Sequence, residues 1–386
     1  MGTDKKHKNI TITQNKMRIV EKRPMHVLQV TPKYCPNIGG VETVVQKISE
    51  TLIAHNMKVT VYSVDLNSSV RKTQNINGVS VKRFKPFLGD PFYLPEPEFS
   101  LALRHEKADI IHVHNIHTLP PLLAALTKHG KQKLVLQPHY HRFGQSAFRH
   151  SLLELYKQGI RRTMLNRVDL ALVNSTYEEK IAREDFPELK NIVLLPEGLD
   201  MKEIKSIKHV PAEPKRILYI GALKSYKNVD KILEGFAQLI NRGNTDCRLV
   251  IIGDGPEHES LVDRAHNLGI DSLVEWKHAL SRKQLLNEYA KASTFILLSR
   301  LESFSRVVYD ALLIGVPVIV LSFGPLQDLV KAGLADGVSL SPQEIADRIL
   351  NSSKKKTQKI PEHMDAFLDW TEYSKRLLDI YREMLE

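Results

Sequence analysis

Short runs of apolar and β-branched residues alternate along most of the chain with segments whose apolar residues recur at helical spacing. The clearest unit spans residues 295–321, where an apolar run, a polar turn, a helical pattern and a second apolar run follow one another. Gly315 comes directly after the helical pattern, as expected for a residue that ends a helix. Buried strands that alternate with helices predict an α/β protein with parallel sheets covered by helices on both faces.

A polar segment with two prolines, residues 206–215, divides this alternation, and we expect it to be an interdomain linker. It separates a first domain, residues 25–205, from a second domain, residues 216–360, followed by C-terminal helices in residues 361–386. Residues 1–24 carry seven Lys or Arg against two acids, which predicts a disordered basic tail.

The composition narrows the class of protein. The chain has 386 residues, of which 42% are hydrophobic, and no run approaches the roughly 20 apolar residues of a membrane span. The first residues are polar and basic, so no signal peptide is expected. Cys35 and Cys247 fall in different halves, which argues against a disulfide and predicts a cytoplasmic protein. The net charge of +11 favours an anionic partner: a nucleotide-sugar, an anionic lipid surface or a nucleic acid.

Two carboxylates stand out in residues 295–321. Glu302 lies in the turn after the first apolar run, at the carboxyl end of a predicted strand, where open parallel sheets bind ligands. Asp310 lies inside a helical pattern of apolar neighbours and needs hydrogen-bond donors if it is buried. The free N–H groups of the helix start favour an anion. Alternatively, Glu302 is a solvated loop acid and Asp310 pairs with a neighbouring base.

Histidines and glycines gather at other predicted strand ends. The histidines are His112, His114, His117, His139 and His141. They form either a metal site or a set of cleft histidines without a metal, and no Cys or clear acidic ligand joins them. Gly39 and Gly40 lie at a strand-to-helix turn, where they permit either close backbone approach to a ligand or only a tight turn.

The stretch with Glu302 and Asp310 resembles the E-x7-E motif of retaining glycosyltransferases of family 4. The resemblance covers about residues 25–386 and implies the GT-B fold. In that fold two Rossmann-like parallel-sheet domains face each other across a cleft, and a C-terminal helix crosses back to the first domain. It also implies that the first domain binds the acceptor and the second binds the nucleotide-sugar donor.

The resemblance implies roles for five residues. In family 4 the first carboxylate holds hydroxyls of the donor sugar and the second holds the ribose, which assigns these roles to Glu302 and Asp310. Backbone groups around Phe304 and Ser305 would face the sugar and the diphosphate. Lys227 matches a lysine that contacts the donor diphosphate in the family.

Other loops extend the resemblance. The segment with Gly39 and Gly40 matches a P-x-x-G-G-x-E loop that lies over the donor phosphates in family 4. Gly253 and Gly255 match a G-D/E-G-P loop whose backbone packs against the nucleotide. His139 matches a histidine next to the reacting sugar, although it could also be a cleft histidine with no chemical role.

The chain departs from the family pattern at four positions. The departures are Glu197 for Asn, Ala222 for Arg, Ser305 for Gly and Asp310 for Glu. Without the arginine, one phosphate contact is missing, and Lys224, Arg306 or Arg300 could replace it.

The resemblance implies a metal-independent, retaining hexosyltransferase that needs no cofactor, and no Asp-x-Asp motif is present. His139 and Glu302 are its expected catalytic residues. The expected partners are a nucleotide diphosphate-sugar and a glycan or lipid-linked acceptor. A basic amphipathic pattern at residues 146–167 predicts either attachment to an anionic membrane or an ordinary surface helix.

Three other functions remain open at this stage. The four departures favour a non-catalytic GT-B protein that binds nucleotide-sugar or assists an active partner. An epimerase of the same fold is a second possibility. A nucleic-acid-binding protein is the third, but no recognised module or aromatic-basic pattern supports nucleic acid as a partner.

Overall fold

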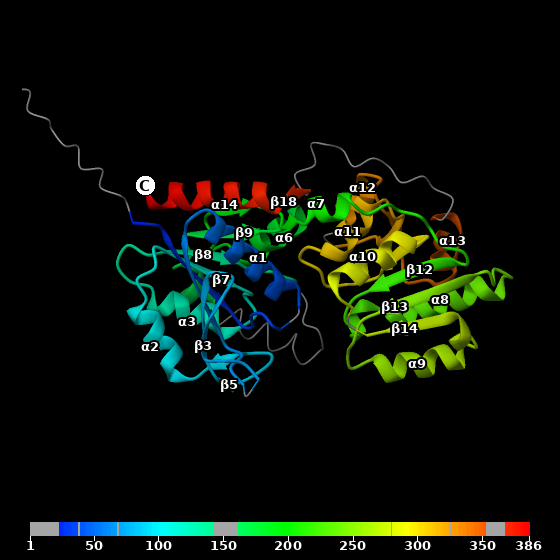
Figure 1. Cartoon of the computed structure of the whole chain (residues 1–386), viewed down its shortest axis with the longest axis horizontal. Helices are drawn as coiled ribbons and strands as arrows, with labels where there is room; N and C mark the ends of the chain where they lie inside the picture. Colours follow the sequence, from blue (N-terminus) through cyan, green and yellow to red (C-terminus); the bar gives the residue numbers. More distant parts are fainter. Residues whose placement is uncertain are drawn as a thin grey trace, which may run out of the picture.

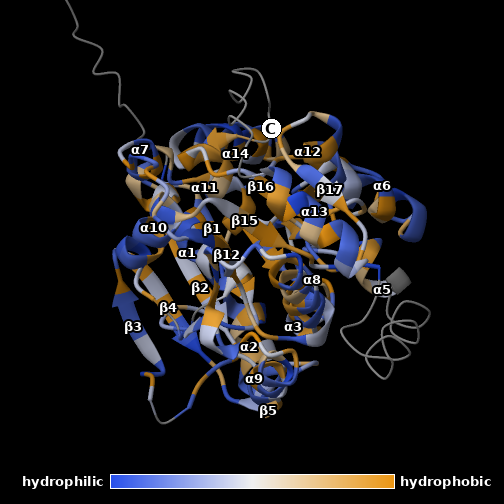
Figure 2. Cartoon of the chain, turned by 90° about the vertical axis from the view of Figure 1, so that its right-hand side faces the viewer, coloured by the Kyte–Doolittle hydropathy of each residue, from blue (hydrophilic) through white to orange (hydrophobic). Residues whose placement is uncertain are grey.

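The structure is a computed structural model that describes residues 23–37, 39–67, 69–142, 161–278, 280–324, 326–352 and 367–386. Figure 1 shows two α/β lobes side by side, with the last helix lying along the first lobe. Most of the strands are buried along their length, while the outer helix faces carry the hydrophilic residues (Figure 2). This is the predicted two-domain α/β arrangement.

The first lobe is built on an eight-stranded sheet with the order β10-β9-β8-β7-β1-β2-β4-β3. Its strands are β1 His26–Thr31, β2 Lys58–Ser63, β3 Thr73–Ile76, β4 Val79–Arg83, β7 Ile110–His114, β8 Lys133–Gln137, β9 Leu170–Val173 and β10 Ile192–Leu194. Its helices are α1 Gly40–Ala54, α2 Pro97–His105, α3 Leu119–Thr127, α5 Arg161–Leu165 and α6 Thr176–Asp185. All paired strands run parallel except β3 and β4.

Alternate residues of the central strands enter two separate cores. Leu28 and Val30 of β1 belong to the core on one face, and Val27 belongs to the core on the other. Because side chains of successive strand residues point to opposite faces, a sheet covered on both sides needs apolar residues at nearly every position. The continuous apolar runs in the sequence reflect this double burial.

The second lobe has a six-stranded parallel sheet with the order β14-β13-β12-β15-β16-β17. Its strands are β12 Lys215–Ile220, β13 Cys247–Ile252, β14 Val274–Lys277, β15 Thr294–Leu297, β16 Val318–Leu321 and β17 Asp336–Val338. Its helices are α8 Val229–Asn241, α9 His258–Asn267, α10 Arg282–Lys291, α11 Arg306–Ile314, α12 Gln327–Lys331 and α13 Pro342–Ser352. Gly315 ends α11 with a positive φ of 94°, as the sequence predicted.

The last helix returns to the first lobe, as predicted. Helix α14, Trp370–Leu385, packs against α1, and Tyr373, Leu377 and Tyr381 complete the core on that face of the first sheet. Strand β11, Gly198–Leu199, pairs with β18, Leu368–Asp369, which holds the start of α14 to the chain that leaves the first lobe. Helix α7, Met201–Lys205, follows β11, and β12 begins ten residues after α7 ends.

Some local features differ from the expectations. Residues 85–97 contain a hairpin of β5 Pro86–Leu88 and β6 Leu94–Pro95, which was not predicted. Strand β3 was not predicted; Asn77 and Gly78 both have positive φ, which suits the tight turn of its hairpin with β4.

Some predictions concern residues that lie wholly or mostly outside the described part of the chain. Residues 1–22 of the predicted basic tail and residues 146–160 of the predicted amphipathic helix lie outside the described residues. Within the described residues, no helix has both the length and the apolar character needed to cross a membrane. Cys35 and Cys247 are both free.

Candidate active site

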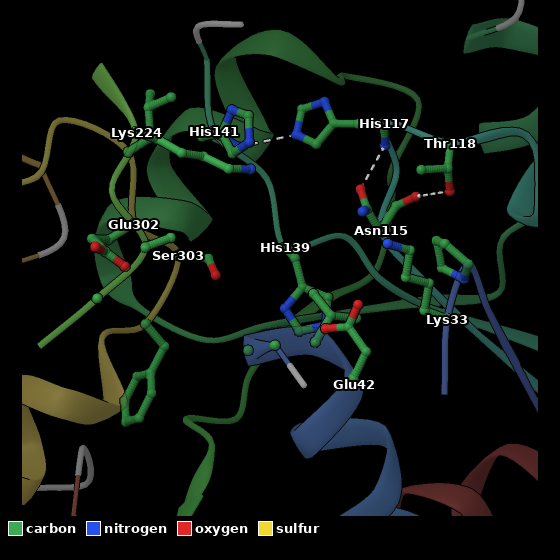
Figure 3. A pocket seen from close by; sticks show the side chains of 18 of the residues that line it. Lys33, Glu42, Asn115, His117, Thr118, His139, His141, Lys224, Glu302 and Ser303 are labelled. Carbon is green, nitrogen blue, oxygen red and sulfur yellow. Dashed lines mark hydrogen bonds between the residues drawn. The ribbon is translucent and has the colours of Figure 1, made fainter. Parts of the chain in front are cut away.

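A cavity of about 900 Å³ lies between the two lobes, where the carboxyl ends of both parallel sheets meet. Loops that follow β1, β7, β8, β12 and β15 line it, and Figure 3 shows their side chains converging from both lobes. This is the usual place for a ligand in open parallel sheets, and the volume is in the range of small-molecule sites.

Most of the predicted site residues line this cavity. They are Gly39, Gly40, His139, Lys224, Lys227, Glu302, Phe304, Ser305 and Arg306. Gly253, Gly255, Asp310 and Arg300 are not among its lining residues. Fold topology therefore brings together residues from both halves of the chain, as expected for a site in the cleft.

Lys227 and Glu302 form an ion pair on the second-lobe wall. Lys227 ends a 3-10 turn, Ser225–Lys227, and its Nζ lies 2.6 Å from Glu302 Oε1. Both side chains are largely buried, with exposed fractions of 13% and 14%. Burial alone would lower the pKa of Lys227, but the Glu302 carboxylate and Tyr226 outweigh it and raise the pKa. Lys227 is therefore a firmly charged group rather than a solvated loop lysine.

The turn that carries Lys227 is held in place by Asn228. Its φ of 52° is left-handed, and its side-chain amide donates a 2.6 Å hydrogen bond to the carbonyl of Leu298 at the end of the neighbouring strand segment. Arg300 donates a 3.0 Å hydrogen bond to Asn228 Oδ1. Arg300 thus supports the loop that carries Lys227.

Helix α11 begins at the cavity wall. Ser305 precedes its first residue, and Phe304 stacks on Tyr309 of the same helix with ring centroids 4.3 Å apart. The first N–H groups of a helix have no intrahelical acceptor, so this wall can bind an anion. Arg306 is paired with Asp200 at 3.0 Å, and Asp200 also accepts from Lys47 of α1 at 2.8 Å.

Asp310 is buried away from the cavity lining. Arg282 of α10 donates two hydrogen bonds to its carboxylate, one of them 3.2 Å long, and also donates to Glu203. This is the pairing with a neighbouring base that we gave as the alternative interpretation. The ribose contact of Asp310 stays a prediction.

The glycines of the 253–255 loop are required by backbone packing. An added Cβ at Gly253 would collide with the carbonyl oxygen of Gly221, and one at Gly255 would collide with the carbonyl of Leu223. Gly253 also has a φ of 147°. These two glycines let the loop after β13 lie against the loop after β12, and their contact with a nucleotide stays a prediction.

The first-lobe wall around His139 is built from buried, uncharged histidines. His139 has a left-handed φ of 46°, and its Nδ1 lies 3.3 Å from the Asn174 amide nitrogen. Burial lowers the pKa of His139 to about 4. Behind it, burial lowers the pKa of His112 to about 3 and that of His114 well below its ordinary value. These imidazoles are therefore neutral at physiological pH.

The same histidines make hydrogen bonds within the fold. His112 Nδ1 lies 2.7 Å from the hydroxyl of Tyr381, and His114 Nε2 lies 2.7 Å from Gln29 Oε1. Across the described ranges, no three His, Cys, Asp or Glu side chains are grouped so that they could hold a metal ion.

Glu197 is a buried acid that faces the cavity. Its exposed fraction is 4%, and its Oε1 lies 3.8 Å from His139 Nδ1. Burial raises the pKa of Glu197 to about 7; Arg306 opposes the shift and Glu302 adds to it. The sequence marked this position only as a departure from the family pattern, because burial depends on contacts between distant segments.

Sequence reasoning also missed several lining residues of the first lobe. They include Lys33, Glu42, Asn115 and Thr118 (Figure 3). Each lies within a few residues of a predicted strand end or of the Gly39-Gly40 turn, so position along the strands was the available signal. Burial raises the pKa of Glu42, the last residue of that glycine loop's motif.

Two family models match consecutive parts of the chain. The one described as Glycosyltransferase Family 4 matches residues 38–203, and the one described as Glycosyl transferases group 1 matches residues 200–365. The matches correspond to the two lobes that enclose the cavity. The chain belongs to the family 4 glycosyltransferases and has their GT-B fold.

Curated relatives span most of the chain. N-acetyl-alpha-D-glucosaminyl L-malate synthase of Bacillus anthracis is 24% identical over 77% of this chain and 80% of its own length. A GDP-mannose-dependent alpha-(1-6)-phosphatidylinositol dimannoside mannosyltransferase of Mycobacterium tuberculosis is 24% identical over 84% of this chain and 87% of its own.

Solved structures share the fold. Sucrose-phosphate synthase of Thermosynechococcus elongatus superposes with a TM-score of 0.74 at 18% identity, covering 93% of this chain and 99% of that one. Anabaena HepE in complex with UDP superposes with a TM-score of 0.69 at 17% identity, covering 93% and 100%. At these identities the likeness concerns the fold alone.

Proposed function

We propose that this glycosyltransferase is a retaining hexosyltransferase that moves a sugar from a nucleotide diphosphate-sugar to a hydroxyl of a glycan or lipid-linked acceptor. The observation that carries the proposal is the buried Lys227–Glu302 pair beside the start of α11. A fixed cation and a helix N-terminus suit a diphosphate leaving group, and an adjacent carboxylate suits sugar hydroxyls.

Each residue has a defined part in the proposed reaction. Lys227 and the N–H groups at the start of α11 stabilise the charge that grows on the departing diphosphate, while Glu302 orients the sugar. The departing phosphate takes the proton of the acceptor hydroxyl, so no protein nucleophile and no metal are assigned. His139 lies at the reacting face, with its ring held by Asn174.

The first test is thermal unfolding with UDP, GDP, ADP and their common sugar conjugates, without added metal. A ligand that binds only the folded state raises stability by about 2.7 kcal/mol at a hundredfold excess over its dissociation constant. We expect one nucleotide class to raise the melting temperature, and Glu302→Gln to keep the nucleotide shift but lose the extra shift from the sugar. No shift with any of these compounds would contradict the proposal.

The stereochemical part needs a separate measurement. We expect NMR of the fresh product to show the anomeric configuration of the donor sugar. An inverted product would remove the retaining assignment and leave glycosyl transfer intact. Tight binding without any transfer would instead support the non-catalytic alternative.

Membrane attachment through residues 146–167 remains part of the proposal. Co-sedimentation with liposomes should require anionic lipid and weaken as salt rises, because the attraction is electrostatic. Absence of sedimentation at low salt would remove this part alone.

A further inference from the structure

Glu197 is a buried acid of the cavity wall. It follows β10 and precedes β11, so its backbone is held by the parallel pairing of β11 with β18. Its side chain is 94% buried yet lines the cavity, and no hydrogen bond joins it to another described side chain. The nearest ring nitrogen is that of His139 at 3.8 Å, beyond hydrogen-bonding distance.

The surroundings do not supply Glu197 with a counter-charge of its own. The groups that act on it or respond to it electrostatically are His139, Glu178, Glu302, Arg306, Tyr309 and Tyr373. Burial keeps His139 neutral at pH 7, and burial raises the pKa of both tyrosines. Arg306 is already paired with Asp200, and Glu302 with Lys227. A buried carboxylate in this setting is better held as the neutral acid.

Glu178 differs from Glu197 although both are buried acids. The Glu178 carboxylate accepts the backbone N–H groups of Tyr140, at 2.5 Å, and Asn174, at 2.7 Å. It is not a lining residue of the cavity. Its bonds are satisfied within the fold, whereas those of Glu197 are open to a ligand.

We propose that Glu197 binds the donor as a neutral carboxylic acid, donating a hydrogen bond to an oxygen of the nucleotide diphosphate-sugar, and that donor binding draws a proton onto this side chain. The inference rests on the proposed donor class. A diphosphate brings negative charge and excludes water, and both effects disfavour the ionised carboxyl. Since burial already raises the pKa of free Glu197 to about 7, the group is partly ionised above neutral pH and takes up a proton on binding.

Calorimetry at pH 7.5 in phosphate and in Tris measures this proton directly. UDP-glucose and GDP-mannose are the probes, because their esterified phosphates do not titrate near neutral pH. With the wild-type protein we expect uptake of about 0.5–1 proton per site, and affinity that falls about fivefold from pH 7 to pH 8. Glu197→Gln keeps a neutral donor group and should bind with little uptake and little pH dependence.

Glu178→Gln is the matched control, because burial also raises the pKa of Glu178, to about 8. It should retain the wild-type proton uptake. Donor binding without uptake, or uptake that survives in Glu197→Gln and disappears in Glu178→Gln, would overturn the inference and leave the proposed function standing. If neither donor binds, the proposed function fails and the inference fails with it. The pH dependence of the wild-type affinity tests the inference even if a variant does not fold.

Discussion

The two walls of the cavity solve the problem of burying polar groups in opposite ways. The second-lobe wall keeps its charges and pairs them, as Lys227 and Glu302 show. The part of the first-lobe wall around His139 and Glu197, here called the neutral wall, removes charge, since burial holds His139 neutral and favours the neutral form of Glu197; the charged side chain of Lys33 also lines that lobe. The second-lobe wall is thus suited to an anion, and the neutral wall is suited to uncharged hydroxyl groups.

The largest expected effect comes from removing the positive charge of Lys227 from the second-lobe wall, here called the charged wall. Lys227→Met should lower kcat/KM for sugar transfer by about 10²–10³-fold, the effect of losing one preorganised donor at a developing anion. The measurement is the rate of nucleoside diphosphate release. Lys231→Ala, at a partly exposed surface pair with Glu234, is the control and should leave the rate unchanged. If the rate of Lys227→Met stays within threefold of wild type, Lys227 does not stabilise the leaving group, and the proposed difference between the two walls is contradicted.

The glycine loops of the two lobes should differ in stability. Gly253→Ala should destabilise the protein by about 2–4 kcal/mol, because a Cβ would collide with the Gly221 carbonyl and the φ of 147° suits only glycine. Gly40→Ala should be neutral to about 1 kcal/mol stabilising, since no atom lies within 4 Å of the added Cβ in α1. Denaturant unfolding measures both. Equal effects would show that the two loops are under the same constraint.

The neutral wall depends on α14 behind it. Tyr381→Phe should cost about 1–3 kcal/mol, because it leaves the buried His112 Nδ1 without its partner. Tyr373→Phe on the same helix is the matched variant: its hydroxyl is buried and lacks a partner among the described residues, so its loss should change stability by less than about 0.5 kcal/mol. Indistinguishable melting temperatures would contradict a supporting role for the Tyr381 contact.

The smallest effect concerns pH and again separates the walls. Because the pKa of His112 and of His139 is lower in the folded state, stability should fall as pH drops below about 6.5. Because burial raises the pKa of Glu178 and Glu197, the folded state holds more protons than the unfolded one, and stability should fall as pH rises from about 4.5 toward 8. Melting temperatures should therefore peak between about pH 4.5 and 6.5 and decline from pH 6.5 to 8. If the melting temperature of the double variant Glu197→Gln/Glu178→Gln stays constant from pH 6.5 to 8, the decline is caused by these two glutamates. If the double variant shows the same decline as the wild type, this explanation is wrong.

The sequence could identify the charged wall because its residues lie in ordered motifs. Glu302 was predicted as a site residue from its place in the turn after a strand, and Lys227 from its match to the family pattern. Their contact could not be, since 75 residues separate them. Asp310 illustrates the limit, because the helical pattern predicted its burial but could not identify Arg282 as its partner.

The neutral wall was harder to predict. Alternating apolar runs gave the sheets, yet burial of Glu197 depends on β11, β18 and α14, which come from opposite parts of the chain. The raised pKa of Glu197 results from this burial, so the residue type alone does not predict it. From the sequence alone, Glu197 was therefore recognised only as a departure from the family pattern, and its burial was not predicted.

The return of α14 has a consequence for the order in which the protein is made. Strand β1 and helix α1 come early in translation, but the part of the Val27 face that α14 covers remains open until α14 leaves the ribosome. Synthesis of the whole second lobe comes between these events. The lobe that begins first is thus completed last, and part of one sheet face stays open to chaperones or to mispairing during that interval.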